Sequence, residues 1–223
     1  MNKKKAIIFD LDDTLIDRNA AIKAYSEVFV DKHFPCVDIC RRSQMIADMA
    51  NNDSHGYIDR KVFFRIITKL WDWKDAPTIE FLEEEWNDGF PKQAIPMENM
   101  NFVLDELKRK SYKIGLITNG VSLFQNTKIN VIGIRCKLDD IIISKEVMMK
   151  KPDPEIFNLA CSNLNLQPEE VIFVGDNLRN DVYGSINAGM AAVWLNNVEA
   201  YDEIEDDVNC IRIRHLIELL EII

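Results

Sequence analysis

The chain has 223 residues, of which 47% are hydrophobic and 29% charged, and its formal net charge is −10. This composition is ordinary for a globular protein with a sizeable core, and the acidic balance argues against a general nucleic-acid binder, because phosphate backbones require a basic face. No apolar run is long enough to span a bilayer, and the run behind the lysine-rich residues 1–5 is too short for a signal peptide. We therefore expect a cytoplasmic protein.

The five cysteines are scattered along the chain, with neither a CxxC pair nor a histidine cluster: Cys36, Cys40, Cys136, Cys161 and Cys210. An odd and unclustered set argues against a disulfide framework and against a zinc site. We expect reduced thiols that serve mostly in packing.

An apolar run at residues 6–9 ends in three carboxylates, Asp10, Asp12 and Asp13. A short run rich in Ile and Phe predicts a buried strand of a parallel sheet. The carboxylates then lie at the strand's C-terminal end, the edge where open α/β sheets bind ligands. Such close carboxylates repel each other unless a cation lies between them, so the stretch favours a Mg²⁺ site. An aspartate-rich turn or helix cap is the alternative.

Residues 17–93 have apolar side chains at helical spacing and no strand-like alternation. Turn signals divide this segment into about four helices. We expect an inserted all-helical cap. Its aromatic side chains are predicted to form the core of the bundle rather than a binding surface: Phe63, Phe64, Trp71, Trp73, Phe81 and Trp86.

Predicted strands and helices alternate from residue 94 onward. The strands are expected at residues 112–118, 140–144, 171–175, 191–195 and, as a short sixth, 210–213, with a closing helix at 215–223. This alternation predicts parallel strands joined by right-handed crossovers. The predicted fold is α/β, a Rossmann-like parallel sheet sandwiched by helices, with residues 1–16 and 94–223 as the core domain and residues 17–93 as the cap.

Polar motifs follow four of the predicted strands or lie just beyond them, and parallel strand ends meet at one edge of a sheet. Asp10 can attack phosphorus as a carboxylate nucleophile. Asp12 can give a proton to the leaving oxygen and later take one from water. Other candidates can bind phosphoryl oxygens, balance charge or hold Mg²⁺: Thr118, the amide of Asn119, Lys151 and Asp176. The set predicts phosphoryl transfer.

In their order along the chain, these motifs resemble those of the haloacid dehalogenase-like (HAD) hydrolase superfamily. The four matching segments are DLDDTL at residues 10–15, LITNG at 116–120, KPDPEIF at 151–157 and GDNLRND at 175–181. The helical insert lies where subfamily I of this superfamily carries its C1 cap. Four ordered motifs in fitting strand context make a specific signal, whereas each alone would be weak.

The resemblance implies a role for each matching residue. Asp10 is the phosphorylated nucleophile, Asp12 is the general acid/base and binds the metal through its backbone carbonyl, and Asp176 is a direct Mg²⁺ ligand. The remaining implied roles are phosphate binding by Thr118 and Asn119, charge balance by Lys151, and a supporting role for Asp181, which reaches the metal through water or fixes the lysine. The family pattern favours Lys151 over the adjacent Lys150 because the functional lysine directly precedes Pro-Asp-Pro.

We therefore expect a Mg²⁺-dependent phosphatase acting on a small phosphorylated metabolite, a nucleoside monophosphate or sugar phosphate, through an aspartyl-phosphate. Its motifs are most similar to those of pyrimidine nucleotidases and phosphoglycolate phosphatases. Asp12 favours phosphate esters, since dehalogenase relatives lack this acid. The alternatives are a sugar-phosphate mutase and a non-catalytic phosphate-binding regulatory protein. The expected partner is a small phosphate ester, with no nucleic acid polymer and no membrane, and the protein is expected to be a monomer or homodimer.

Substrate choice is expected to come from the cap, because the core residues contact only the phosphate. The candidate side chains are Arg18, His55, Arg60 and Lys61. The alternative for each is a solvated charge at a helix end.

Overall fold

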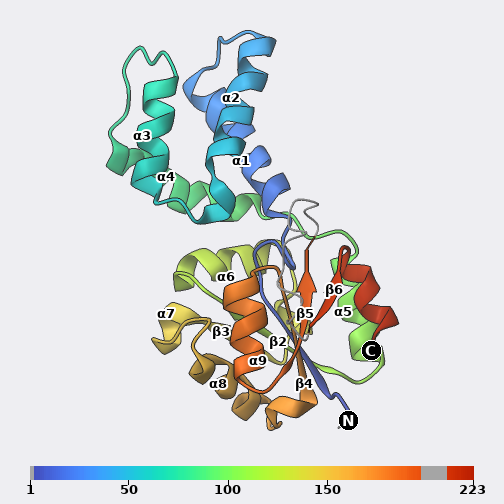
Figure 1. Ribbon diagram of the computed structural model, residues 1–223. Coiled ribbons are helices and arrows are strands. Elements are labelled where there is room, and N and C mark those ends of the chain that lie inside the picture. Colours follow the sequence, from blue (N-terminus) through green and yellow to red (C-terminus); the bar gives the residue numbers. More distant parts are fainter. Residues whose placement is uncertain (1–2, 197–209) are drawn as a thin grey trace. The chain divides into compact units, whose positions relative to one another are not determined.

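The computed structural model describes residues 3–196 and 210–223 of the chain. Its internal contacts divide the chain into two compact units, one made of Met1–Ile16 and Pro96–Ile223 and the other of Asp17–Ile95. The first unit contains a six-stranded parallel sheet, and the second is helical (Figure 1). The α/β fold with a helical insert, predicted from the sequence, is confirmed.

The sheet has the strand order β3-β2-β1-β4-β5-β6, with every neighbouring pair parallel. The strands are β1 Ala6–Phe9, β2 Lys113–Thr118, β3 Asp140–Ile143, β4 Val171–Gly175, β5 Ala191–Leu195 and β6 Ile211–Ile213. All four residues of β1 are buried, which explains its unbroken apolar sequence. In the register, Phe9 pairs with Leu116 of β2 and with Val174 of β4. Strand β2 continues two residues and β4 one residue beyond this level, so the three strands end at the same edge of the sheet.

Helices cover the sheet. They are α5 Met100–Arg109, α6 Ser122–Val131, α7 Ser144–Val147, α8 Pro154–Leu164 and α9 Gly184–Asn187. Helix α8 contacts β2, β3 and α9, whereas α5 contacts β2 and a C-terminal 3-10 helix at Leu216–Glu221. One local prediction was wrong and one helix was missed: the closing helix is this shorter 3-10 helix, and the sequence analysis did not predict α7. Four- to six-residue helices show too few turns for a periodic signal.

The helical unit contains α1 Arg18–His33, α2 Ile39–Asn52, α3 Arg60–Leu70, α4 Ile79–Gly89 and short 3-10 helices at Ser54–Gly56 and Phe90–Gln93. Each of the four α-helices begins at a side-chain cap that accepts hydrogen bonds from the first turn: Asp17, Asp38, Asp59 and Thr78. An oxygen at this position satisfies N–H groups that have no partner within the helix. The caps therefore determine where the helices start.

The core of the helical unit is aromatic, as predicted. Phe63, Phe64, Trp71 and Trp86 are buried, and the Trp86 ring stacks on Phe90 with centroids 4.2 Å apart. The prediction was wrong for Phe81, which is 48% exposed, because it lies on the outer face of α4. The core of this unit therefore includes rings from α3 and α4 and from the residues that directly follow each of these helices.

All five cysteines are free thiols. The expectation that they serve in packing holds for Cys161, which lies in the core between α8 and the sheet. It was wrong for Cys36, Cys40 and Cys136, which are exposed in loops or the first turn of a helix. Among the described residues, no helix has both the length and the apolar character needed to cross a membrane.

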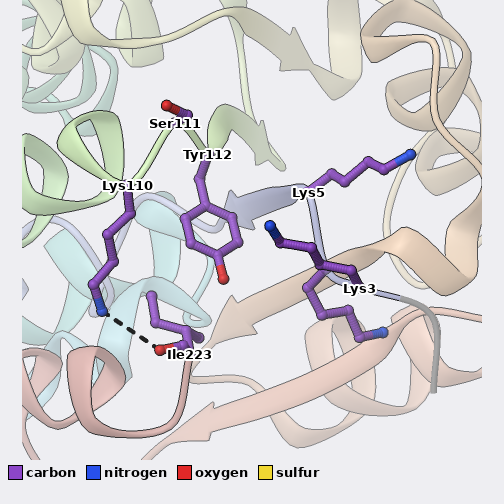
Figure 2. A pocket seen from close by; sticks show the side chains of 7 residues that line it. Lys3, Lys5, Lys110, Ser111, Tyr112 and Ile223 are labelled. Carbon is purple, nitrogen blue, oxygen red and sulfur yellow. Dashed lines mark hydrogen bonds between the residues drawn. The ribbon is translucent and has the colours of Figure 1, made fainter.

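A pocket with a volume of about 310 Å³ opens at the N-terminal end of the central strands (Figure 2). Its lining is basic: Lys3, Lys4, Lys5, Lys110, Ser111, Tyr112 and Ile223. Lys110 donates to the carbonyl oxygen of Ile223 at 3.4 Å, and Lys5 pairs with Glu170 at 2.6 Å. These lysines tie neighbouring segments together at the end of the sheet opposite Asp10.

Candidate active site

The chain leaves β1 at Asp10 and turns back on itself at once. The backbone N–H of Asp10 still donates to the carbonyl of Val174 at 2.9 Å, while Leu15 and Ile16 both donate to the carbonyl of Leu11. This turn buries Leu11 completely. The two flanking carboxylates, on Asp10 and Asp12, therefore lie at the edge of the sheet.

Three carboxylates meet at this edge. One oxygen from each of Asp10, Asp176 and Asp181 lies within 4.8 Å of the others. Asp10 follows β1, and the other two follow β4, the neighbouring strand. A set of carboxylate oxygens with no nitrogen or sulfur donor is the ligand chemistry that Mg²⁺ and other hard divalent cations prefer. The cluster therefore fits a divalent metal.

The segment after β4 brings Asp181 back toward the sheet. Residues Leu178–Tyr183 form a π-helix, in which Asp181 and Val182 both donate to the carbonyl of Asn177. The backbone N–H of Asn177 in turn donates to Asp181 Oδ2 at 3.0 Å. A Cβ on Gly175 would lie 2.5 Å from the Cβ of Asp181. Glycine at this position therefore allows Asp181, the second acid of the motif, to approach the end of β4.

Lys151 is buried against the carboxylates. Its ammonium lies 2.5 Å from Asp10 Oδ1 and 2.7 Å from Asp181 Oδ1, the latter an ion pair rather than an aligned hydrogen bond. Asn119 accepts a hydrogen bond from the backbone N–H of Lys151 and donates one to its carbonyl, both at 3.0 Å. The Asn119 side chain therefore holds the lysine segment, and Lys150 is exposed.

The electrostatics of the cluster follow from its burial. Burial raises the pKa of Asp10 to about 7, with Lys151 opposing and Asp181 adding to the rise. Burial and the nearby charges of Asp10 and Asp181 raise the pKa of Asp176 well above its ordinary value. For Lys151, burial lowers the pKa, but the two carboxylates outweigh this effect and raise it. In the absence of a metal, Asp10 and Asp176 therefore hold protons more tightly than ordinary aspartates do.

Two residues of α6 that the sequence analysis missed also reach this edge. Lys128 lies 2.7 Å from each carboxylate oxygen of Asp12. The Gln125 side-chain amide donates to Thr118 Oγ1 at 2.6 Å and lies 3.2 Å from Asp12 Oδ2. No short motif marks these positions. The one signal in the sequence is that Gln125 and Lys128 are polar residues one turn apart in the helix that follows Thr-Asn-Gly.

In the helical unit, two of the four cap candidates, Arg18 and Arg60, are not simple solvated charges, whereas Lys61 is exposed. Arg18 donates two 3.0 Å hydrogen bonds to the Asp53 carboxylate, and Arg60 donates a third at 2.8 Å. The Arg60 guanidinium also lies 4.5 Å from the centroid of the Trp86 ring. His55 is exposed. Two guanidinium groups thus share one buried carboxylate.

Replacing this carboxylate should destabilise the protein. Asp53→Asn keeps the shape of the side chain but leaves the buried Arg18 without its counter-charge, at an expected cost of about 3 kcal/mol in the free energy of unfolding. Urea denaturation of the wild type and the variant measures this cost. The matched control is Asp31→Asn, which removes the exposed partner of Arg42 and should change the unfolding midpoint little. Equal midpoint shifts for the two variants would contradict the expectation.

A sequence model of the haloacid dehalogenase-like hydrolases matches residues 7–195. The chain belongs to this family. It is 30% identical over 198 residues to a glyceraldehyde 3-phosphate phosphatase of Methanothermobacter thermautotrophicus, a match covering 86% of each chain. It is also 42% identical over 127 residues to the pyrimidine 5'-nucleotidase YjjG of Escherichia coli, covering 56% of each. The expected family and enzyme class, a phosphoric monoester hydrolase, are confirmed.

The fold is also found among solved structures. The HAD-hydrolase YfnB of Bacillus subtilis, whose crystal structure was determined with bound magnesium, is similar with a TM-score of 0.77 and 22% identity, over 99% of both chains. At this level of identity the likeness concerns the fold. The HAD-like hydrolase fold of this chain therefore includes both its sheet and its helical insert.

Proposed function

We propose that this chain is a Mg²⁺-dependent phosphatase that hydrolyses a small phosphorylated metabolite through an aspartyl-phosphate on Asp10. The position of the Asp10 carboxylate carries the proposal. It is buried at the end of β1, with Lys151 2.5 Å from one oxygen and Asp176 and Asp181 beside it. A carboxylate that attacks a phosphoryl group needs nearby positive charge to offset the repulsion between the two anions. The Lys151 ammonium supplies such a charge.

In the proposed first step, an Asp10 oxygen forms a bond to phosphorus while the ester P–O bond breaks. The leaving oxygen takes a proton from the carboxyl group of Asp12. In the second step, water gives a proton to Asp12 and its oxygen attacks phosphorus, which releases phosphate and restores Asp10. Lys151 balances charge on the nucleophile throughout.

The proposed phosphate-binding groups lie at the end of β2. Thr118 Oγ1 accepts a hydrogen bond from Gln125, so its own proton points elsewhere and can be donated to a phosphoryl oxygen. The backbone N–H of Asn119 is the proposed second donor. The metal would be held by Asp10, Asp176 and the backbone carbonyl of Asp12, with Asp181 adjacent. When bound, a divalent metal neutralises charge on the phosphoryl oxygens.

We also propose that the two parts of the chain have different roles. Residues 1–16 and 94–223 carry the chemistry, and residues 17–93 act as a cap that selects the leaving group. The cluster of Arg18 and Arg60 around Asp53 supports this proposal, since it holds two guanidinium groups, the donors best suited to carboxylates and phosphates. Such a cluster suits a polar or anionic leaving group.

Phosphate release from a panel of phosphate esters, with Mg²⁺ and with a chelator, tests the proposed function. Glyceraldehyde 3-phosphate and pyrimidine 5'-nucleotides come first in the panel because relatives are named for them. Metal-dependent release of free phosphate supports hydrolysis. Phosphate moved to another hydroxyl of the same molecule would instead indicate a mutase, and binding without turnover a non-catalytic protein.

Mg²⁺ should bind more weakly at lower pH, because the pKa values of the site carboxyl groups are raised. The raised pKa values of Asp10, about 7, and of Asp176 mean that these carboxyl groups hold protons more tightly than ordinary aspartates do, and Mg²⁺ must displace those protons to bind. Calorimetry should therefore show weaker Mg²⁺ binding at about pH 6 than at about pH 8, with more proton release at the lower pH. An affinity that is the same at both pH values would contradict this expectation.

The same shift affects the stability of the metal-free protein. The folded state binds the Asp10 proton more tightly than the unfolded state does, so this contribution to stability is lost as pH rises through about 7. Mg²⁺ replaces the missing protons. The increase in Tm on adding Mg²⁺ should therefore be larger at about pH 8 than at about pH 6.

A further inference from the structure

Helix α6 begins four residues after the end of β2 and presents two polar side chains to the proposed site. Gln125 and Lys128 are one turn apart, so they lie on the same face of the helix. Both are buried, and the Lys128 side chain is only 2% exposed. Its ammonium lies 2.7 Å from Oδ1 and 2.7 Å from Oδ2 of Asp12.

Gln125 connects the same carboxylate to the phosphate-binding strand end. Its side-chain amide nitrogen lies 2.6 Å from Thr118 Oγ1 and 3.2 Å from Asp12 Oδ2. The close approach depends on Gly120, because a Cβ there would lie 2.9 Å from the Cγ of Gln125. A glutamine and a lysine of one helix thus meet at a single acid, and the glycine before that helix leaves room for the glutamine side chain.

Stability alone gives a poor account of this arrangement. A fully buried ammonium loses its hydration, and ion pairs of this kind are often no more stable than well-packed apolar residues of similar volume. Lys128 also lies 4.7 Å from the centroid of the Phe124 ring, an environment that a methionine could share. The carboxylate that it contacts is the proposed proton donor and acceptor of the reaction.

We propose that Lys128 and Gln125 are positioning residues that hold the Asp12 carboxyl group in the orientation needed for proton transfer. This inference rests on the proposed function and deepens it. When Asp12 passes its proton to the leaving oxygen, negative charge develops on the oxygens that Lys128 contacts. A pre-oriented cation there stabilises that charge without reorganisation. Gln125 contacts both Asp12 and Thr118 and so keeps the Asp12 carboxyl group at a fixed distance from the Thr118 hydroxyl.

Loss of a positioning residue for Asp12 should affect substrates differently according to their leaving groups, whereas loss of a purely structural residue should affect all substrates alike. An alkyl phosphate needs a proton on its leaving oxygen when the ester bond breaks, whereas 4-nitrophenol leaves readily as the phenolate. The constant kcat/KM covers the steps up to this bond cleavage. Loss of Asp12 positioning should therefore lower kcat/KM for alkyl phosphates and affect 4-nitrophenyl phosphate little.

The test compares the full-length wild type with Lys128→Met, using the best alkyl phosphate of the panel and 4-nitrophenyl phosphate. We expect kcat/KM to fall about 100-fold for the alkyl ester and less than about fivefold for the aryl ester, since general acid catalysis contributes on this scale. Lys128→Arg should recover part of the alkyl activity. The control is Lys137→Met, which removes a surface ion pair with Asp105 in the same unit and should leave both substrates unaffected.

Equal losses for both substrates, or no loss for either, would overturn the inference. If Lys128→Met does not fold, as judged by circular dichroism and Tm, Gln125→Leu provides the second variant, and the same dependence on the leaving group is expected. Wild-type protein without metal-dependent phosphate release would refute the proposed function itself. This failure of the proposed function can be told apart from a failure of the Lys128 inference, because it is measured on the wild type alone.

Discussion

Asp10→Asn is expected to abolish metal-dependent phosphate release. The amide keeps the size of the side chain but cannot act as a carboxylate nucleophile, so kcat should fall by about 10⁴-fold or more, as for other enzymes that lose their nucleophile. The substitution also removes one charge from a cluster in which burial raises the pKa of Asp10 to about 7. The folded structure should therefore persist, and the metal-free variant should be at least as stable as the wild type above that pH.

Two measurements make this prediction specific. Acid quenching during turnover, followed by intact-mass analysis, should detect a phosphorylated wild-type protein and no phosphorylated Asp10→Asn protein. Asp13→Asn is the matched control, because it changes the third acid of the same segment at a backbone φ of 55°, which asparagine tolerates. This control should keep most of the activity. Turnover by Asp10→Asn at the wild-type rate would mean that another group is phosphorylated.

Lys151→Met is expected to have the next largest effect. The substitution leaves the carboxylates of Asp10 and Asp181 without the ammonium that now lies 2.5 and 2.7 Å from them. It also removes the charge that would offset the approach of a phosphate dianion to Asp10. We expect kcat/KM to fall by roughly 10²–10³-fold, the scale seen when one fixed electrostatic contact is removed.

The neighbouring lysine provides the control for this variant. Lys150→Met changes the same residue type one position earlier, where the side chain is exposed, and should leave kcat/KM unchanged. Steady-state kinetics of both variants at saturating Mg²⁺ separate the two lysines. If Lys150→Met causes the larger loss, the proposed assignment is wrong.

Much of the fold could be read from local sequence. The run Ala6–Phe9 is apolar without interruption because β1 is buried by strands and helices on all sides, and this pattern identifies a central parallel strand. Polar residues begin where β1, β2 and β4 end, and all three strands run in the same direction. That is why candidate site residues far apart in the sequence could be grouped at one edge.

Other elements escaped prediction because no local pattern encodes them. The expected closing helix at residues 215–223 is a 3-10 helix at Leu216–Glu221. The helix after β4 opens as a π-helix at Leu178–Tyr183, where two N–H groups share the carbonyl of Asn177. These deviations arise from hydrogen bonds that satisfy particular backbone groups, and residue periodicity is not sensitive to them.

By itself, the sequence determined the family, the sheet with its helical insert, and the chemical character of the candidate site, because strand ends and their carboxylates are encoded within a few residues. The family pattern already favoured Lys151 over Lys150, but only the tertiary structure placed the Lys151 ammonium against Asp10 and assigned the Asn119 side chain to the backbone of Lys151. It also paired Asp12 with Lys128, which is 116 positions away. Contacts of this kind depend on which buried groups need a partner once the chain has folded, and that need is absent from any short stretch of sequence.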